Sequence, residues 1–259
     1  MLPGIFLLAI VGWLDDRFTV SSLLRLSVQL AVSLWLLGFA WFQFSLSDTG
    51  FFVIAAVAIV WLMNLYNFMD GSNGMAGFQG VFAGVTMAVL FRSGGQHAMS
   101  LVSLSVAAAC IGFLPLNFPR ARVFMGDVAS VPLGFIFASL GLFGVLTGSF
   151  SLYVAILIMS VFIVDATMTL LARVIRRERW YTAHAQHVYQ RLITQGWSHR
   201  RVLVVYQTAN VILVLPAIVL AEICPQYAMM TGGVMFLLLG SCWHIANRRL
   251  GMFAKVQLK

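Results

Sequence analysis

Charged residues are scarce in this chain. They make up 9% of its 259 residues, whereas 61% of the residues are hydrophobic. About a quarter of the residues of a soluble domain are charged. The mean hydropathy of +0.95 agrees with this bias. The composition excludes a soluble globular domain and predicts an integral membrane protein.

Cysteine is also scarce, and its placement argues against a disulfide framework. Cys110 and Cys242 lie in apolar stretches, and Cys224 stands alone in an expected turn. The regularly spaced, paired cysteines of a disulfide-rich fold are therefore missing.

Long apolar runs are abundant instead. A helix needs about 20 apolar residues to cross the hydrocarbon core of a bilayer, and no stretch alternates polar and apolar residues as a half-buried strand does. We predict an all-α fold, a polytopic transmembrane helical bundle of about nine helices, in a single domain over residues 1–259. The expected spans are 23–46, 51–63 extending towards 67, 75–91, 99–116, 131–146, 152–171, 202–221 and 228–245.

The first apolar run, residues 1–14, is short for a span. It also lacks the basic start and the small-residue cleavage site of a signal peptide. We interpret it as the end of a longer helix, and we expect the chain to be shortened at its N-terminus.

Basic residues collect on one side of the predicted bundle. When the connections alternate across the membrane, only Arg92 of the 16 Lys and Arg residues falls on the opposite side. The positive-inside rule makes the crowded side, with its basic loop 172–201, cytoplasmic. The net charge of +8 favours anionic membrane lipids or a phosphorylated substrate as partners, and not nucleic acid.

Segment 64–77 introduces three amides and a carboxylate directly after an apolar run. If the helix continues to Asp70, then Asn64, Asn67 and Asp70 recur every three residues and share one face. Asn73 follows, among glycines that permit close approach of a ligand or another helix. Such polarity requires a membrane edge or a wet cavity. The alternative is a polar helix end with glycines for packing.

Asp15 and Asp16 follow the first apolar run. Adjacent carboxylates repel each other unless a cation neutralises them. The pair therefore suits proton abstraction or Mg²⁺ attraction, and the alternative is a solvated loop.

Segment 117–127 forms a shaped loop, because Pro119 prevents simple continuation of the preceding helix. An exposed Phe124 would stack on a base while Asp127 holds a metal ion. In the alternative interpretation, Phe124 dips into lipid and Asp127 pairs with Arg120 or Arg122.

The last polar block lies beyond Asp165, a carboxylate within an apolar helix. At such depth a carboxylate costs about 2.5–3.5 kcal/mol, so Asp165 should face other helices or a wet site. If segment 182–191 is helical, His184 and His187 share a face with Arg191. This trio suits anionic oxygen better than zinc, because no third zinc ligand stands nearby.

All four polar blocks fall on the predicted cytoplasmic side. Carboxylates, amides, an aromatic ring, histidines and an arginine at a membrane surface favour Mg²⁺-assisted phosphoryl transfer.

Over essentially the whole chain, four motifs in this order resemble the signature blocks of the polyprenyl-phosphate N-acetylhexosamine-1-phosphate transferases. They are Gly12-Trp-Leu-Asp-Asp-Arg17, Asn64-Leu-Tyr-Asn-Phe-Met-Asp-Gly71, Val123-Phe-Met-Gly-Asp127 and the segment 184–191. The last motif is most similar to the branch that initiates O-antigen.

The resemblance implies a multi-pass enzyme of the bacterial inner membrane with its active site on the cytoplasmic face. Using Mg²⁺ or Mn²⁺, it would transfer a sugar-1-phosphate from a UDP-N-acetylhexosamine to undecaprenyl phosphate, release UMP and start a lipopolysaccharide or other cell-wall glycan. A homodimeric assembly is left open.

The resemblance also implies roles for single residues. Asp127 would hold the metal ion, Phe124 would stack on uracil, and Asn117 would help to bind the nucleotide. Asp15 and Asp16 would activate undecaprenyl phosphate or form a covalent intermediate. Other groups would line the pocket or contact the substrate: Asn64, Asn67, Asp70, Asn73, His184, His187 and Arg191.

Two departures from the family pattern leave alternatives open. Asn73 stands where many members carry aspartate, and about two further spans and a cytoplasmic loop normally precede the paired aspartates. A catalytically inactive truncated scaffold or a transporter is one alternative. An intramembrane prenyltransferase is another, although the spacing from Asn67 to Asp70 fits its aspartate-rich helices poorly.

Overall fold

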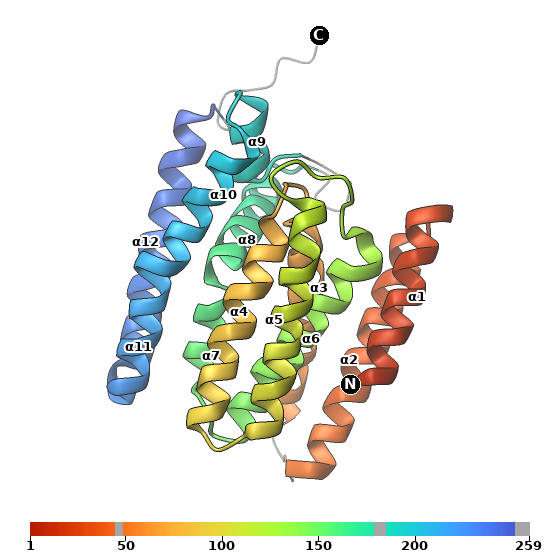
Figure 1. Cartoon of the computed structure of the whole chain (residues 1–259), viewed down its shortest axis with the longest axis vertical. Helices are drawn as coiled ribbons and strands as arrows, with labels where there is room; N and C mark the ends of the chain where they lie inside the picture. Colours follow the sequence, from red (N-terminus) through yellow and green to blue (C-terminus); the bar gives the residue numbers. More distant parts are fainter. Residues whose placement is uncertain (45–48, 179–184, 252–259) are drawn as a thin grey trace.

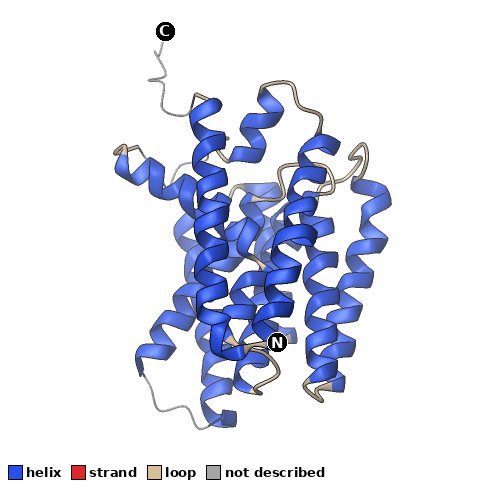
Figure 2. Ribbon diagram, turned by 90° about the vertical axis from the view of Figure 1, so that its left-hand side faces the viewer, coloured by secondary structure: helices blue, strands red, loops and turns tan. Residues whose placement is uncertain are grey.

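The computed structural model describes residues 1–44, 49–178 and 185–251 of the chain. Within these ranges the structure is helical and contains no strand, which confirms the predicted all-α fold. The long helices lie side by side along one axis and form a bundle (Figures 1 and 2).

Seven described helical segments are long and apolar enough to cross a membrane. They are α2 (Ser22–Phe44), α3 (Thr49–Phe68), α4 (Met75–Ser93), α5 (His97–Asn117), α6 (Gly126–Leu146), the run of α10 (His199–Thr208), η1 (Ala209–Val214) and α11 (Leu215–Ile223), and the run of η2 (Pro225–Tyr227) and α12 (Ala228–Arg249).

Two further apolar elements bring the described bundle to the predicted nine. The first is α1 (Leu2–Phe18), whose N-terminus lies part-way along the bundle in Figure 1. The second is the pair α7 (Leu152–Ile158) and α8 (Ser160–Ile175), bent by 77°. A short helix, α9 (Val188–Thr194), lies within the predicted basic loop 172–201.

The bend at Met159 corrects the prediction of one straight span over residues 152–171. A bend frees backbone carbonyl groups that a straight helix would pair. Here Gln79 of α4 donates from Nε2 to the carbonyl oxygen of Ile158 at 3.0 Å. A buried amide on a neighbouring helix thus satisfies the break within the bundle.

The predicted span 202–221 is also irregular, because residues 209–214 form a π-helix that ends two positions before Pro216. Proline has no amide hydrogen to donate to the preceding turn. Asn210 in this stretch donates from Nδ2 to Gln79 Oε1 at 2.7 Å. Gln79 therefore links both irregular segments.

Helix α1 packs closely on α6 through Gly12. A Cβ atom on Gly12 would lie 2.5 Å from the carbonyl carbon and oxygen of Asp127. Glycine at this position lets the two backbones approach, as small residues commonly do between membrane helices. The contact brings the end of α1, with its paired aspartates, to the start of α6.

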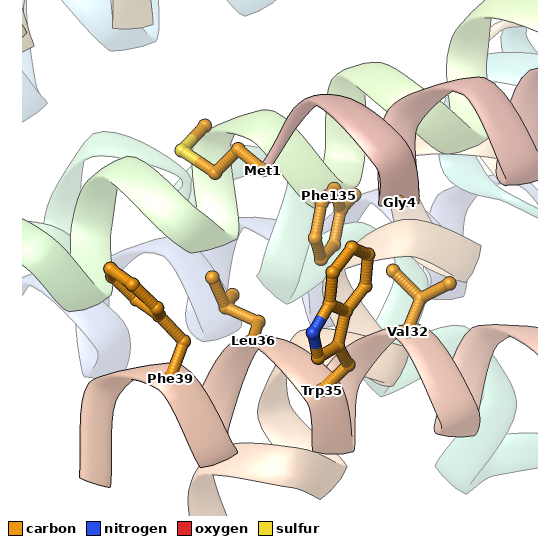
Figure 3. Close-up of a pocket in the computed structure, with 7 residues that line it drawn as sticks. All are labelled: Met1, Gly4, Val32, Trp35, Leu36, Phe39 and Phe135. Atoms are coloured by element: carbon orange, nitrogen blue, oxygen red, sulfur yellow. The ribbon is translucent and has the colours of Figure 1, made fainter. Parts of the chain in front are cut away.

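An apolar pocket opens between α1, α2 and α6 (Figure 3). None of the side chains that line it is titratable. Its lining residues are Met1, Gly4, Val32, Trp35, Leu36, Phe39 and Phe135.

Candidate active site

Arg25 joins carboxylates from two helices. Its Nη1 atom donates to Asp15 Oδ2 at 2.6 Å and to Asp127 Oδ2 at 2.9 Å. Asp15 lies in the last turn of α1, Arg25 in the first turn of α2, and Asp127 in the first turn of α6. The two carboxylate side chains are 15% and 19% exposed. Arg25 therefore holds three helix ends together at one partly buried charge cluster.

Arg25 was expected only to contribute to the cytoplasmic positive charge. Arg120 or Arg122 was the alternative predicted partner of Asp127, and the structure pairs Asp127 with Arg25 instead. The sequence did contain a signal for this ion pair, because Arg25 lies ten residues after Asp15 at the start of the next helix. A short turn between two helices brings the start of the second helix close to the end of the first.

Asp16 binds the start of α6. Its two carboxylate oxygens accept from the backbone amides of Asp127 at 3.2 Å and Val128 at 3.4 Å. The first amides of a helix have no partner within the helix, and its N-terminus attracts negative charge. Gly126 has a φ of +61°, and a Cβ atom there would lie 2.5 Å from Asp16 Oδ2. Glycine at this position keeps room for the carboxylate.

Asp70 lies in the turn after α3, facing the same helix start. Because α3 ends at Phe68, the helix does not continue to Asp70, which was the condition for a face shared with Asn64 and Asn67. Burial raises the pKa of Asp70 to about 7, and the charges of Asp127 and Asp16 push that pKa in the same direction. The backbone amides of Gly126 and Met125 oppose the shift. Asp70 thus adds a fourth carboxylate to the cluster.

Asn67 and Asn64 take different positions on α3. The side chain of Asn67 hydrogen-bonds with the Asp127 carboxylate, which places it in the cluster. Asn64 donates from Nδ2 to Gln29 Oε1 at 2.7 Å and to the Val60 carbonyl oxygen at 2.7 Å. Asn64 therefore holds α3 against α2.

Asn117 and Asn73 connect the two loops that border the cluster. Asn117 is 1% exposed; its Oδ1 accepts from the Gly74 amide at 2.6 Å, and its Nδ2 donates to the Val123 carbonyl oxygen at 2.8 Å. Asn73 donates from Nδ2 to the Pro119 carbonyl oxygen at 3.0 Å. The buried Asn117 side chain thus hydrogen-bonds to the backbone of both loops and holds them together.

Phe124 lies on the loop that precedes α6, and 52% of it is exposed. An exposed aromatic ring can stack on a planar ligand. The same exposure agrees with the alternative of contact with lipid.

The helix expected over residues 182–191 is not continuous in the part that the structure describes, because residues 185–187 precede α9. His184 lies outside the described residues. His187 precedes α9, is buried, and its ring stacks on Phe68 with 5.9 Å between centroids. Arg191 donates from Nη2 to the Leu250 carbonyl oxygen at 3.0 Å. The shared face was expected from a helix over 182–191, whereas α9 begins at Val188.

His187 is a buried imidazole close to both a carboxylate and an arginine. Burial lowers the pKa of its imidazole, and the nearby Arg173 acts in the same direction, against the charge of Asp165. Its ring also packs between the aromatic rings of Phe68 and Tyr189. The proposed contact of His187 with a substrate diphosphate stays a prediction.

Asp165 faces other helices, one of the two environments predicted for it, and has partners on α9 and α10 as well as on its own helix α8. Its Oδ1 accepts from the Val188 amide at 2.9 Å and from Thr169 Oγ1 at 3.3 Å. Its Oδ2 accepts from the Tyr206 hydroxyl at 2.6 Å. These bonds satisfy a carboxylate that is 4% exposed.

The donor set of the cluster suits a hard cation. Carboxylate and amide oxygens are the ligands that Mg²⁺ prefers, and Mg²⁺ is commonly held by one or two carboxylates together with substrate phosphates. The described residues hold no group of three or more His, Cys, Asp or Glu side chains arranged to bind a metal ion without such help. The fit of the cluster to a cation is therefore one of ligand chemistry, because its side chains supply carboxylate and amide oxygens.

The first part of the chain matches a known protein family. The sequence profile of glycosyl transferase family 4 matches residues 1–145. All four clustered carboxylates lie in the matched segment, whereas α9 and the helices that follow lie outside it.

Three known proteins illustrate the similarity. A probable undecaprenyl-phosphate N-acetylglucosaminyl 1-phosphate transferase from Bacillus subtilis is 31% identical over 84% of this chain and 64% of its own length. A decaprenyl-phosphate N-acetylglucosaminephosphotransferase from Mycolicibacterium smegmatis is 30% identical over 80% and 59%. A phospho-N-acetylmuramoyl-pentapeptide-transferase from Bacillus pumilus is 29% identical over 63% and 49%. The chain thus spans less than two thirds of the length of each of these relatives.

Proposed function

The chain belongs to glycosyl transferase family 4, the polyprenyl-phosphate N-acetylhexosamine-1-phosphate transferases, and from this membership we propose that it transfers an N-acetylhexosamine-1-phosphate from a UDP-sugar to undecaprenyl phosphate. A phosphate oxygen of the lipid attacks the phosphorus that bears the sugar. The bond from that phosphorus to the bridging oxygen breaks, and UMP leaves. The names of the relatives support the lipid acceptor and favour N-acetylglucosamine as the sugar.

One observation carries the proposal: four carboxylates and an arginine from separate helices converge at one end of the bundle. Asp15 and Asp127 share Arg25, Asp16 binds the start of α6, and Asp70 faces the same start. Enzymatic phosphoryl transfer depends mainly on positioning and on compensation of charge. A rigid cluster of charged groups at a membrane helix end supports that chemistry.

The residues around Asp127 fit a divalent cation. Asp127 would hold Mg²⁺, or Mn²⁺ in its place, with Asp15 and the Asn67 amide alongside. When bound, such a cation would neutralise charge on the diphosphate of the UDP-sugar.

The remaining residues divide into substrate contacts and supports. Phe124 stacks on the uracil ring, because it is exposed on the loop that leads into α6 and Asp127. Asp15 and Asp70 act on the acceptor phosphate, and Asp16 aligns α6 because both of its oxygens accept backbone amides. Asn117 and Asn73 keep the two bordering loops together.

We place the site on the cytoplasmic face of a bacterial inner membrane and its product at the start of a lipid-linked cell-surface glycan such as O-antigen. The concentration of Lys and Arg on the predicted inner side supports this orientation. The similarity of the last motif to the O-antigen branch supports the product.

Release of UMP tests the proposal. Membranes that contain the protein, supplied with UDP-N-acetylglucosamine, undecaprenyl phosphate and Mg²⁺, should release UMP in proportion to the lipid added. Asp127→Asn should lower the rate by about 100-fold or more, because a preorganised charge at the reacting phosphates is lost.

Glu222→Gln serves as the matched control, because it removes a carboxylate in α11, outside the described cluster. We expect this variant to retain the wild-type rate. Equal rates for Asp127→Asn and wild type would reject the role of Asp127. Absence of UMP release by the wild type with each N-acetylated UDP-sugar would reject the transferase and favour an inactive scaffold.

A further inference from the structure

Tyr189 clamps the backbone turn that carries Asp70. Its hydroxyl donates to the Phe68 carbonyl oxygen at 2.8 Å and accepts from the Gly71 amide at 3.2 Å. Phe68 ends α3, so its carbonyl has no helical partner of its own. One hydroxyl therefore bonds the backbone on both sides of Asp70.

The turn is shaped to receive that hydroxyl. A Cβ atom on Gly71 would overlap the Tyr189 hydroxyl oxygen. The ring of Tyr189 is fully buried, and His187 stacks on it and on Phe68 with centroid separations of 6.1 Å and 5.9 Å. The phenol is thus held rigidly against the turn.

Asp165 fixes the helix that carries Tyr189. Its carboxylate accepts from the amides of Val188 at 2.9 Å and Tyr189 at 3.5 Å, at the start of α9. A seven-residue helix has little stability by itself, so its position depends on such tertiary bonds. Tyr206 of α10 donates to the same carboxylate at 2.6 Å.

Thr169 extends the anchorage to α12. Its hydroxyl donates to Asp165 Oδ1 at 3.3 Å and accepts from the Trp243 indole Nε1 at 3.3 Å. Helices α8, α9, α10 and α12 therefore meet at one buried carboxylate. The hydrogen bonds of Tyr189 connect this junction to the turn at Asp70.

We propose that Tyr189, held in place by Asp165, is a positioning residue that sets the Asp70 carboxylate beside Asp16 and Asp127 for the transfer reaction. The inference rests on the proposed function and deepens it. It gives Tyr189 of segment 184–191 a structural role next to the turn at Asp70. It also gives Asp165 a role, because Asp165 holds the start of the helix that carries Tyr189.

Tyr189→Phe tests the clamp, because it removes one oxygen and keeps the ring. We expect kcat for UMP release to fall by about 10- to 100-fold, since small displacements of a catalytic group have effects of this size. The KM for UDP-N-acetylglucosamine should change by no more than about 2-fold. An unchanged stoichiometry of UDP-N-acetylglucosamine binding would show that the loss is not a loss of folded protein.

Tyr227→Phe is the matched control, because Tyr227 is half exposed in the turn before α12. This variant should retain both kinetic constants. A rise in KM for Tyr189→Phe with unchanged kcat would overturn the proposal, because it would make Tyr189 a substrate contact.

A second substitution isolates the contact itself. Gly71→Ala should be strongly impaired in the wild-type background, where the new methyl group overlaps the hydroxyl. The same change should cost less in the Tyr189→Phe background, where the hydroxyl is gone. Equal losses in both backgrounds would overturn the clamp.

Hydrogen exchange makes the test independent of activity. In Tyr189→Phe, the amide of Gly71 should exchange about 5-fold faster, as expected for loss of one hydrogen bond. Unchanged exchange would overturn the clamp. If the wild type releases no UMP, the proposed function fails, and the exchange of Gly71 together with the thermal stability of the two Gly71→Ala variants still decides whether the clamp exists.

Discussion

Asp70 is buried among other acids without a cation of its own in the described contacts. The groups that act on its carboxylate are the backbone amides of Gly126 and Met125 and the carboxylates of Asp127 and Asp16. Burial raises the pKa of Asp70 from 3.8 to about 7. The folded state therefore binds a proton at this residue more tightly than the unfolded state does.

The sign of the resulting pH dependence follows from linkage. Between about pH 4 and pH 7 the folded protein holds more protons at Asp70 than the unfolded chain, so this residue makes stability fall as the pH rises. The stability that Asp70 contributes is complete below the unfolded pKa and is lost once the pH passes the folded pKa.

Asp70→Asn should remove this dependence. In detergent with a chelator present, the variant should melt at least about 2 °C above the wild type at pH 8, because it carries no buried charge. The difference should shrink towards pH 5. Thermal unfolding at several pH values measures it, and a difference that stays constant across that range would contradict the raised pKa.

At the scale of the helices, the packing of α1 on α6 determines where Asp16 lies. Gly12 is the close point, where a Cβ atom would meet backbone atoms of Asp127 and Val128. Backbone cannot move aside as a flexible side chain can, so the helices would have to separate. Separation would lengthen the bonds from Asp16 to the first amides of α6.

Gly12→Ala should therefore destabilise the protein by about 1–3 kcal/mol, the usual cost of overpacking, and should reduce UMP release. Gly38→Ala on α2 is the matched control, because nothing lies within 4 Å of its Cβ position. That change should be neutral or slightly stabilising. Equal melting temperatures and rates for the two variants would contradict the close contact of α1 with α6.

Two spans show why the sequence could not predict every element. Apolar length alone predicted straight helices over residues 152–171 and 202–221. Gln79 hydrogen-bonds with both the Ile158 carbonyl at the bend and Asn210 in the π-helix. Such contacts join residues more than 75 positions apart and leave no local periodicity.

Across the whole molecule, topology predicted more than side-chain geometry did. Alternation of spans placed the paired aspartates, the turn at Asp70 and the loop before Asp127 at the same end of the bundle, and the structure gathers them there. The alternation of spans did not predict that Arg25 bridges Asp15 and Asp127, or that Asn117 is enclosed between two loops. These details depend on how helices rotate and pack, which hydropathy does not encode.

The account depends on the carboxylates of separate helices acting as one catalytic unit. A double-mutant cycle in UMP release, with Asp15→Asn, Asp127→Asn and the combined variant, tests this most directly. If the two groups act together through Arg25, the combined variant should be about as slow as the slower single variant. Rate losses that multiply, as for two independent sites, would contradict the account.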